Sequence, residues 1–172
     1  MVRYAEPGVV EWVESGGGPL IAVPETVLPF WTGADGEEAA SDYDRACEVD
    51  GHVGFLPVGD STALVLGDEP VSTAFLPDHG TFVRWCAADA EDELLASVPA
   101  ALRTAEWEPE ARWEVPGAVR LFDAAWPGGE STGTDHVTVA LEPGRYAVRA
   151  AHVRPGPETW LGLVQLRRLG HR

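Results

Sequence analysis

Hydrophobic and polar positions alternate along much of this chain, which is the two-residue period of β-strands with one buried face. The alternating runs are short, and glycine, proline and acidic residues separate them, as in antiparallel sheets joined by tight turns. One segment differs, because at 89–103 apolar residues such as Leu94 and Val98 recur at a helical spacing. The strands that the pattern predicts are 9–14, 20–23, 52–58, 62–66, 71–76, 81–87, 112–115, 118–125, 136–141, 146–152 and 160–169.

Two helices carry signals at their ends. Ser41 can cap a short helix over 41–47, and Asp44 stands at the position that completes a capping box. Asp89 is expected to cap the longer helix, whose first turn is acidic as the helix dipole favours. Pro99 lies inside that longer helix and predicts a kink or a break.

Proline and glycine also mark the turns. A helical turn is expected at 24–31, since proline suits the first helical position. The Gly-Asp pair at 59–60 predicts a hairpin between the strands on either side. The segment 142–145, Glu-Pro-Gly-Arg, has proline and glycine at the favoured places of a tight turn and predicts a second hairpin.

These elements predict an α+β fold that is predominantly antiparallel β. We expect two similar β-units packed as a sandwich-like single domain with one or two short helices. The length of 172 residues is that of one domain. Segments near 49–56 and 78–82 echo segments near 115–122 and 142–146. One interpretation is a repeat whose halves are 1–104 and 105–172, and chance similarity is the other.

The acidic residues are unevenly distributed. The formal net charge is −16, and all twelve basic residues are arginine. Residues 1–100 contain 19 Asp or Glu and three Arg, whereas residues 101–172 contain nine of each kind, so the first hundred residues carry the whole net charge. Such a chain would repel nucleic-acid phosphates and would attract a basic partner. Solubility alone would also explain the acidity.

Membrane insertion and secretion are not expected. The longest apolar runs are far shorter than the roughly 18 residues that a membrane helix needs, and no apolar signal segment follows Met1. Cys47 and Cys86 form no paired motif, so we expect buried thiols in a reducing compartment, although a disulfide between them stays open. The cytoplasm is the predicted location.

Motifs for catalysis or metal binding are missing from the sequence. The five histidines form no zinc-binding spacing, and no GxSxG motif is present. No cofactor, metal ligand or catalytic residue is therefore predicted. Paired carboxylates could still serve a small hydrolase, which is one alternative.

Acidic clusters and exposed tryptophans are the better candidates for a binding surface. Acids at the edges of elements are common in recognition, and an aromatic ring beside them is typical of an interface hot spot. Trp31 and Trp126 are expected to be exposed, and only Trp31 stands beside an acidic loop. The predicted partner-binding residues are Trp31, Asp42, Asp44, Asp68, Glu69, Asp89, Glu91 and Asp92.

Eight segments spread over most of the chain form a recognisable set of motifs, namely 12–21, 42–47, 64–70, 72–73, 82–85, 88–89, 144–149 and 158–163. In these segments the chain resembles the bacterial immunity protein 21 family of polymorphic toxin systems. Its C-terminal half also resembles the competence protein J family, whose members are associated with nuclease inhibition.

The resemblance implies a protein that works by binding. Immunity proteins bind a cognate toxin, often a nuclease with a basic cleft, in the cytoplasm of the cell that makes it. An acidic surface in residues 1–100 would then cover that cleft, and the second half would serve as scaffold. The alternatives are the hydrolase above and an acidic regulatory module that binds an unrelated basic protein.

Overall fold

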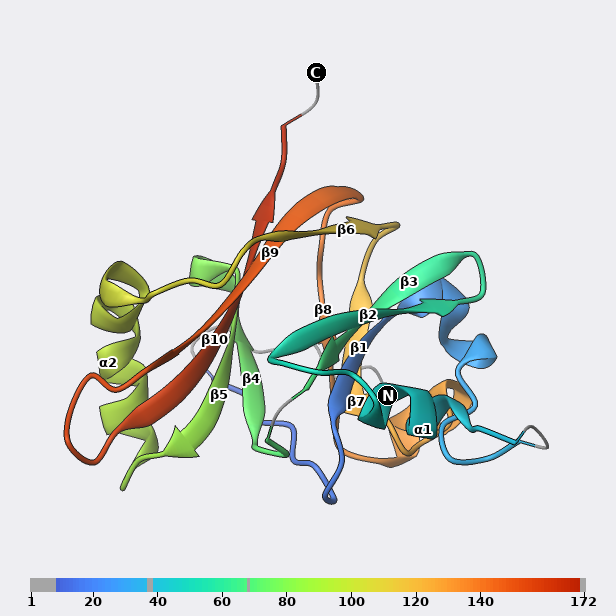
Figure 1. Ribbon diagram of the computed structural model, residues 1–172, viewed down its shortest axis with the longest axis horizontal. Helices are drawn as coiled ribbons and strands as arrows, with labels where there is room; N and C mark the ends of the chain where they lie inside the picture. Colours follow the sequence, from blue (N-terminus) through green and yellow to red (C-terminus); the bar gives the residue numbers. More distant parts are fainter. Residues whose placement is uncertain (1–8, 37–38, 68, 171–172) are drawn as a thin grey trace.

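Two five-stranded antiparallel sheets pack face to face in the computed structural model, which describes residues 9–36, 39–67 and 69–170 (Figure 1). We name each sheet after its central strand. In order, the β1 sheet comprises β2 (Val53–Val58), β3 (Ser61–Leu66), β1 (Leu20–Pro24), β7 (Val119–Asp123) and β8 (His136–Val139). The β10 sheet comprises β4 (Thr73–Leu76), β5 (Thr81–Ala87), β10 (Trp160–Arg168), β9 (Gly144–Val153) and β6 (Ala111–Val115). The expected β-rich α+β fold is confirmed.

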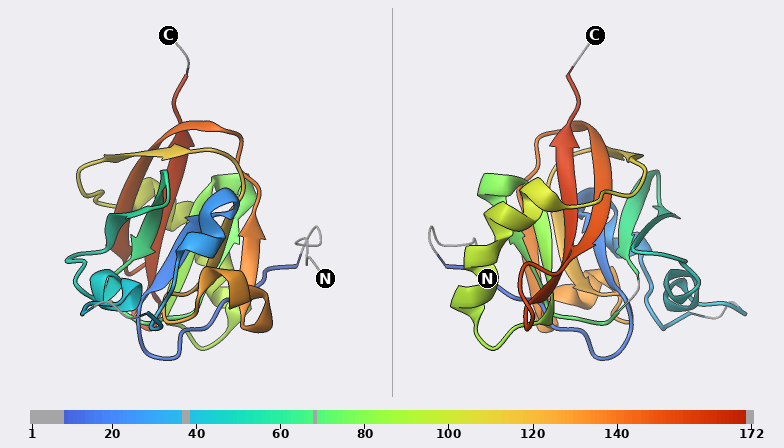
Figure 2. Two further views of the ribbon diagram at one scale, coloured as in Figure 1. Left: turned by 90° about the vertical axis from the view of Figure 1, so that its right-hand side faces the viewer. Right: turned by 60° about the vertical axis from the view of Figure 1, so that its left-hand side comes forward.

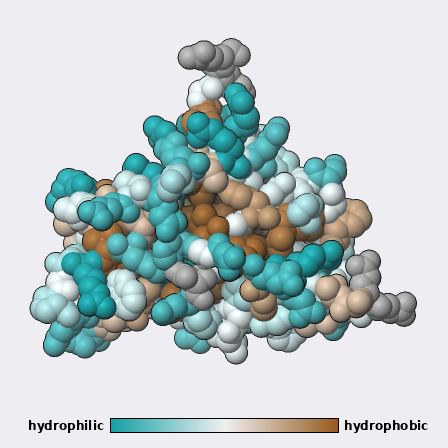
Figure 3. Space-filling model, viewed as in Figure 1, coloured by the Kyte–Doolittle hydropathy of each residue, from teal (hydrophilic) through white to brown (hydrophobic). Residues whose placement is uncertain are grey.

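The main core lies between the sheets. Alternate residues of each strand face inward, as the two-residue period requires, so Leu20 from β1 and Phe82 from β5 share one apolar cluster. Trp113 of β6 is buried in the same cluster, and its indole Nε1 donates to the carbonyl oxygen of Thr62 at 2.8 Å. That bond joins an edge strand of one sheet to the other sheet. Figure 3 shows the surface of the molecule in the view of Figure 1. Hydrophobic residues lie at the centre of this view, where the two sheets meet, and hydrophilic residues surround them.

Helices cover the outer faces of the sheets, so both faces of the central strands are buried. The helix α2 (Glu91–Thr104) lies on the outer face of the β10 sheet, where Leu94 and Val98 pack against Leu161. The 3-10 turn η1 (Glu25–Phe30) and the helix α1 (Asp42–Cys47) cover the β1 sheet. Two further 3-10 turns are η2 (Pro77–His79) and η3 (Gly128–Gly133). Figures 1 and 2 show α1 and α2 on opposite sides of the molecule.

One strand prediction and one pairing prediction are wrong for tertiary reasons. The segment 9–14 forms only one bridge, from Val13 to Thr73, because the glycine-rich turn that follows carries the chain to the other sheet. The hairpin expected around 142–145 does not form, since β8 belongs to the β1 sheet and β9 to the β10 sheet. Both strands face the shared core from opposite sides. The hairpin at 59–60 is confirmed, with Gly59 at φ 58°.

The helix ends are only partly as expected. The capping box of Ser41 and Asp44 is confirmed, because both of its hydrogen bonds are present. Ala90 takes the N-cap of α2 in place of Asp89, and no side chain caps that helix. Pro99 does not break α2, which runs unbroken because its apolar face packs on the β10 sheet.

The cysteines differ from expectation as well. Cys47 is exposed and Cys86 is partly exposed, and no disulfide joins these two residues. Both side chains therefore contradict the prediction of buried thiols. No helix within the described ranges is long and apolar enough to cross a membrane. Both sheets contain strands from 1–104 and from 105–172, and the internal repeat stays a prediction.

Candidate functional site

The uneven charge follows the sheets more closely than it follows the halves of the sequence. Among the described residues, the segments 15–36, 39–67 and 116–142, which form the β1 sheet and its covering turns, contain 11 Asp or Glu and two Arg. The segments 69–115 and 143–170, which form the β10 sheet and α2, contain 11 Asp or Glu and eight Arg. The described residues on the β1 sheet side therefore have a formal charge of −9, against −3 on the β10 sheet side, and the potential of the β1 sheet side would favour cations more strongly.

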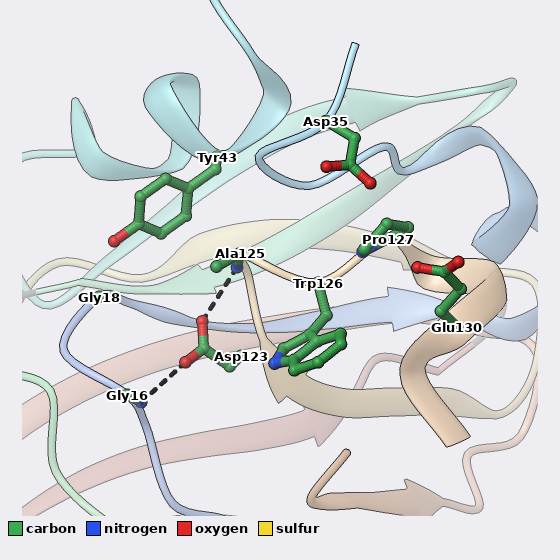
Figure 4. A pocket seen from close by; sticks show the side chains of 9 residues that line it. All are labelled: Gly16, Gly18, Asp35, Tyr43, Asp123, Ala125, Trp126, Pro127 and Glu130. Carbon is green, nitrogen blue, oxygen red and sulfur yellow. Dashed lines mark hydrogen bonds between the residues drawn. The ribbon is translucent and has the colours of Figure 1, made fainter. Parts of the chain in front are cut away.

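A shallow hollow of about 440 Å³ opens on the β1 sheet side. Three separate parts of the chain form it, namely the glycine turn before β1, the region around α1, and the loop that links β7 to η3 (Figure 4). Its walls combine carboxylates with two aromatic side chains. The lining residues are Gly16, Gly18, Asp35, Tyr43, Asp123, Ala125, Trp126, Pro127 and Glu130.

Asp123 anchors the floor of the hollow. It ends β7, is 7% exposed, and accepts hydrogen bonds from the backbone N–H groups of Gly16 and Ala125 at 2.8 and 2.9 Å (Figure 4). The carboxylate thus ties the glycine turn to the β7 loop. Its negative charge also remains just beneath the surface of the hollow.

Two glycines let the loops around the hollow approach closely. Gly33 has φ 62°, and a Cβ there would lie 2.5 Å from the carbonyl oxygen of Ala125. A Cβ at Gly128 would overlap the carbonyl oxygen of Leu28. Backbone hydrogen bonds join the loops at the same points. The N–H of Ala34 donates to the carbonyl oxygen of Ala125 at 2.9 Å, and the N–H of Gly128 donates to the carbonyl oxygen of Trp31 at 2.8 Å. The wall of the hollow is therefore fixed before any partner arrives.

Tyr43 and Trp126 give the hollow its aromatic surface. Trp126 is 44% exposed, which agrees with its expected exposure. The pKa of Tyr43 is raised above its ordinary value, first by a hydrogen bond with Cys47, then by burial and by the charges of Cys47, Asp123 and Asp44. The Tyr43 hydroxyl consequently stays protonated and neutral at physiological pH.

A second hollow continues the first one. It shares Asp35 with the first and extends along α1 to Phe30, which is 63% exposed. Exposed aromatic rings surrounded by a polar rim are typical of a protein-binding surface. We call this region the acidic-aromatic surface, defined by Phe30, Asp35, Tyr43, Trp126 and Glu130.

Three of the residues predicted to bind a partner have structural roles. Trp31 is 2% exposed, so the expectation of an exposed ring is wrong, and its Nε1 donates to the carbonyl oxygen of Ala124 at 3.0 Å. Asp42 is 8% exposed and accepts from the backbone N–H and the hydroxyl of Thr32 at 2.8 and 3.0 Å, and from Arg45. Asp44 completes the capping box.

The other predicted residues lie elsewhere. Asp68 falls outside the described residues, and the neighbouring Glu69 is exposed. Asp89, Glu91 and Asp92 stand at the start of α2, on the opposite side of the molecule from α1 (Figure 1). The structure therefore places Asp42 and Asp44 on α1 far from Asp89, Glu91 and Asp92, so these five predicted acids do not share one face.

The group at the start of α2 contains a pair of facing carboxyl groups. The pKa of Glu158 is raised, mainly because its carboxyl shares a hydrogen bond with Asp89 and lies close to the negative charge of that residue. A carboxyl with a raised folded-state pKa favours the folded state at low pH, and this contribution is lost as pH rises and the proton leaves.

We therefore expect Glu158→Gln to raise the midpoint of thermal unfolding near neutral pH. The gain should shrink as pH falls towards about 4, where an ordinary glutamate is itself protonated. Thermal unfolding at several pH values measures this. The control is Glu106→Gln, which removes the same charge from another exposed acid and should show a smaller effect. Equal shifts in both variants would contradict the pairing.

Tyr43, Asp35 and Glu130 were missing from the predicted site. Asp35 stands in the acidic loop beside Trp31, and the Trp-Pro-Gly-Gly turn at 126–129 does indicate an exposed ring. No spacing in the sequence, however, relates Tyr43 to Glu130, because tertiary folding alone brings them together. The second half of the chain also supplies part of the lining of this hollow.

The fold and this surface define an α+β domain of two packed sheets with an acidic and aromatic hollow on one side. The chain belongs to the immunity protein 21 family, whose family model matches residues 11–159. No curated protein and no solved structure matches the chain. The resemblance to the immunity protein 21 family is thus confirmed, and the one to the competence protein J family gains no support.

Proposed function

We propose that this domain is a non-enzymatic immunity protein that binds and neutralises a cognate toxin in the cytoplasm of the cell that makes the toxin. The observation that carries the proposal is the acidic-aromatic surface, found on a chain of the immunity protein 21 family. A partner with a basic surface, such as a nuclease with a phosphate-binding cleft, complements its charge.

The form of the hollow supports binding to a protein. Pockets for small substrates enclose most of their ligand. Here Asp35, Trp126 and Glu130 are all exposed, so the hollow is open to solvent along its rim. Its deepest carboxylate, Asp123, is engaged by two backbone amides. An open hollow of this kind can accept a side chain that protrudes from a flat or convex protein surface.

The decisive experiment uses the toxin encoded beside this gene. We expect the purified domain to form a complex with that toxin and to abolish its activity at equal concentration. Because charge steers the encounter, the association rate should fall by about tenfold or more from low to high salt, with a smaller change in the dissociation rate. Stopped-flow kinetics and a toxin activity assay measure both.

A toxin from an unrelated system is the control and should remain active. If the adjacent toxin stays fully active in the presence of excess domain, the proposal is wrong. Neutralisation without salt dependence would retain the immunity function but would exclude a charge-steered encounter. A regulatory module for an unrelated basic protein would also fail to protect against the adjacent toxin.

A further inference from the structure

We infer that the acidic-aromatic surface accepts an arginine side chain that protrudes from the partner, with the guanidinium group against the ring of Trp126 and between the carboxylates of Asp35 and Glu130. The inference rests on the proposed function and specifies which chemistry of the toxin is recognised. It depends on three features of the described residues: uncompensated charge, an accessible ring and a fixed frame.

The negative charge of the hollow is not neutralised internally. Arg45 pairs with Asp42, and Arg120 bonds to Ser131 at 3.0 Å and approaches Glu25 at 3.8 Å. Neither arginine lines the first hollow, and Arg45, which does line the second hollow, is paired with Asp42. Among the residues that the structure describes, neither Asp35 nor Glu130 forms an ion pair, so both carboxylates are available to a cation from outside.

The ring of Trp126 provides a second attraction for a cation. Guanidinium groups stack on tryptophan faces more readily than ammonium groups do. The same arrangement occurs twice in this protein, where Arg149 lies 4.0 Å from the ring centre of Trp107 and Arg154 lies 4.7 Å from that of Trp160. Trp126 has no such partner among the described residues and presents its ring to the hollow (Figure 4).

The frame around these groups favours arginine from a protein over a small free cation. Asp123 adds a negative charge beneath the floor, and this charge is one of those that raise the pKa of Tyr43. Gly33 and Gly128 hold the loops in place, so little conformational entropy is lost on binding. A planar guanidinium can stack on Trp126 and still donate to carboxylates at its edge, which a point charge cannot do.

A defined probe tests the inference without the toxin. A blocked oligo-arginine peptide is titrated into the domain of residues 1–172 at an ionic strength of about 0.15 M, where the Debye length is about 8 Å, and binding is followed by calorimetry. The isosteric oligo-citrulline peptide is the neutral control. We expect the arginine peptide to bind, and Trp126→Leu, which retains apolar bulk but removes the ring, to weaken it by about fivefold. Asp35→Asn with Glu130→Gln should weaken it further.

A matched variant distinguishes binding at the hollow from the general electrostatic attraction of a basic peptide to an acidic protein. Asp78→Asn with Glu106→Gln removes the same two charges from exposed positions that line neither hollow. This variant should reduce binding by less than about twofold, since surface charges more than a Debye length away are screened. Equal losses in the two double variants, or an unchanged affinity for Trp126→Leu, would overturn the inference.

The toxin then distinguishes the inference from the function on which it rests. If the adjacent toxin binds the wild-type domain but is held equally well by Trp126→Leu and by the Asp35 and Glu130 variant, the arginine site is wrong and the immunity function stands. If the toxin does not bind the wild-type domain, the proposed function fails. In that case the peptide titration alone decides whether the hollow recognises arginine.

Discussion

Replacing Trp31 by alanine is expected to lower the free energy of unfolding by about 3–5 kcal/mol, because it removes a large ring from a packed core. The ring is 2% exposed and belongs to the cluster between the β1 sheet and its covering turns. The change also leaves the carbonyl oxygen of Ala124 without its indole donor. A loss of this size is a large part of the stability of an ordinary domain.

Urea unfolding measures the effect, and two further variants divide it into parts. Trp31→Phe retains most of the apolar volume but loses the N–H group, so it should cost about 1–3 kcal/mol. Trp126→Ala removes an equally large side chain that is 44% exposed, and it should cost less than about 1 kcal/mol. If Trp31→Ala were as stable as Trp126→Ala and bound the toxin less tightly, Trp31 would be an interface residue after all.

Trp31 was expected to be exposed, but its neighbour Phe30 is the exposed ring, and this difference shows a limit of prediction from sequence. Phe30 and Trp31 are adjacent, yet Phe30 is 63% exposed and Trp31 is buried. The 3-10 turn η1 ends at Phe30. The backbone at Trp31 is extended, and the Trp31 side chain therefore points into the core. Composition alone does not indicate which of two aromatic neighbours faces the core.

The acidic residues show the same limit for a different reason. Asp42 and Asp44 are acids at a helix start, which suits both partner binding and capping, and the structure shows that they hold α1 and the loop before it. Asp35 and Glu130 lie far apart in the chain and line the same hollow only because the loop before α1 packs beside the segment that contains η3. Their proximity is a tertiary property that periodicity cannot predict.

The sequence predicts the fold better than it predicts the residues of the candidate site. Alternating positions predicted most strands within a few residues of their observed bounds, because the alternation arises from one face of each strand meeting a core. The expected hairpin from 136 to 152 was wrong since β8 and β9 alternate in the same way but join different sheets. Local pattern identifies a strand without identifying its partner.

The two sheets also depend on a buried arginine, which gives the second large effect. Arg84 lies on β5, is 2% exposed, and donates to the carbonyl oxygens of Gly67 and Glu69, the former at 2.6 Å. These carbonyls belong to the segment that leaves β3 and crosses to the β10 sheet. Gly162 on the neighbouring strand leaves room, since a Cβ there would lie 3.2 Å from the Cβ of Arg84.

We expect Arg84→Ala to lower the free energy of unfolding by about 2–4 kcal/mol, because carbonyl groups lose their donor and a cavity forms. Arg84→Lys should recover only part of this loss, since one ammonium group cannot reproduce the forked donors of a guanidinium. The control is Arg112→Ala, whose side chain is 63% exposed and pairs with Glu110 at 3.3 Å. It should cost less than about 0.5 kcal/mol. Urea unfolding curves that placed Arg84→Ala beside Arg112→Ala would show that the crossing segment is held by other contacts.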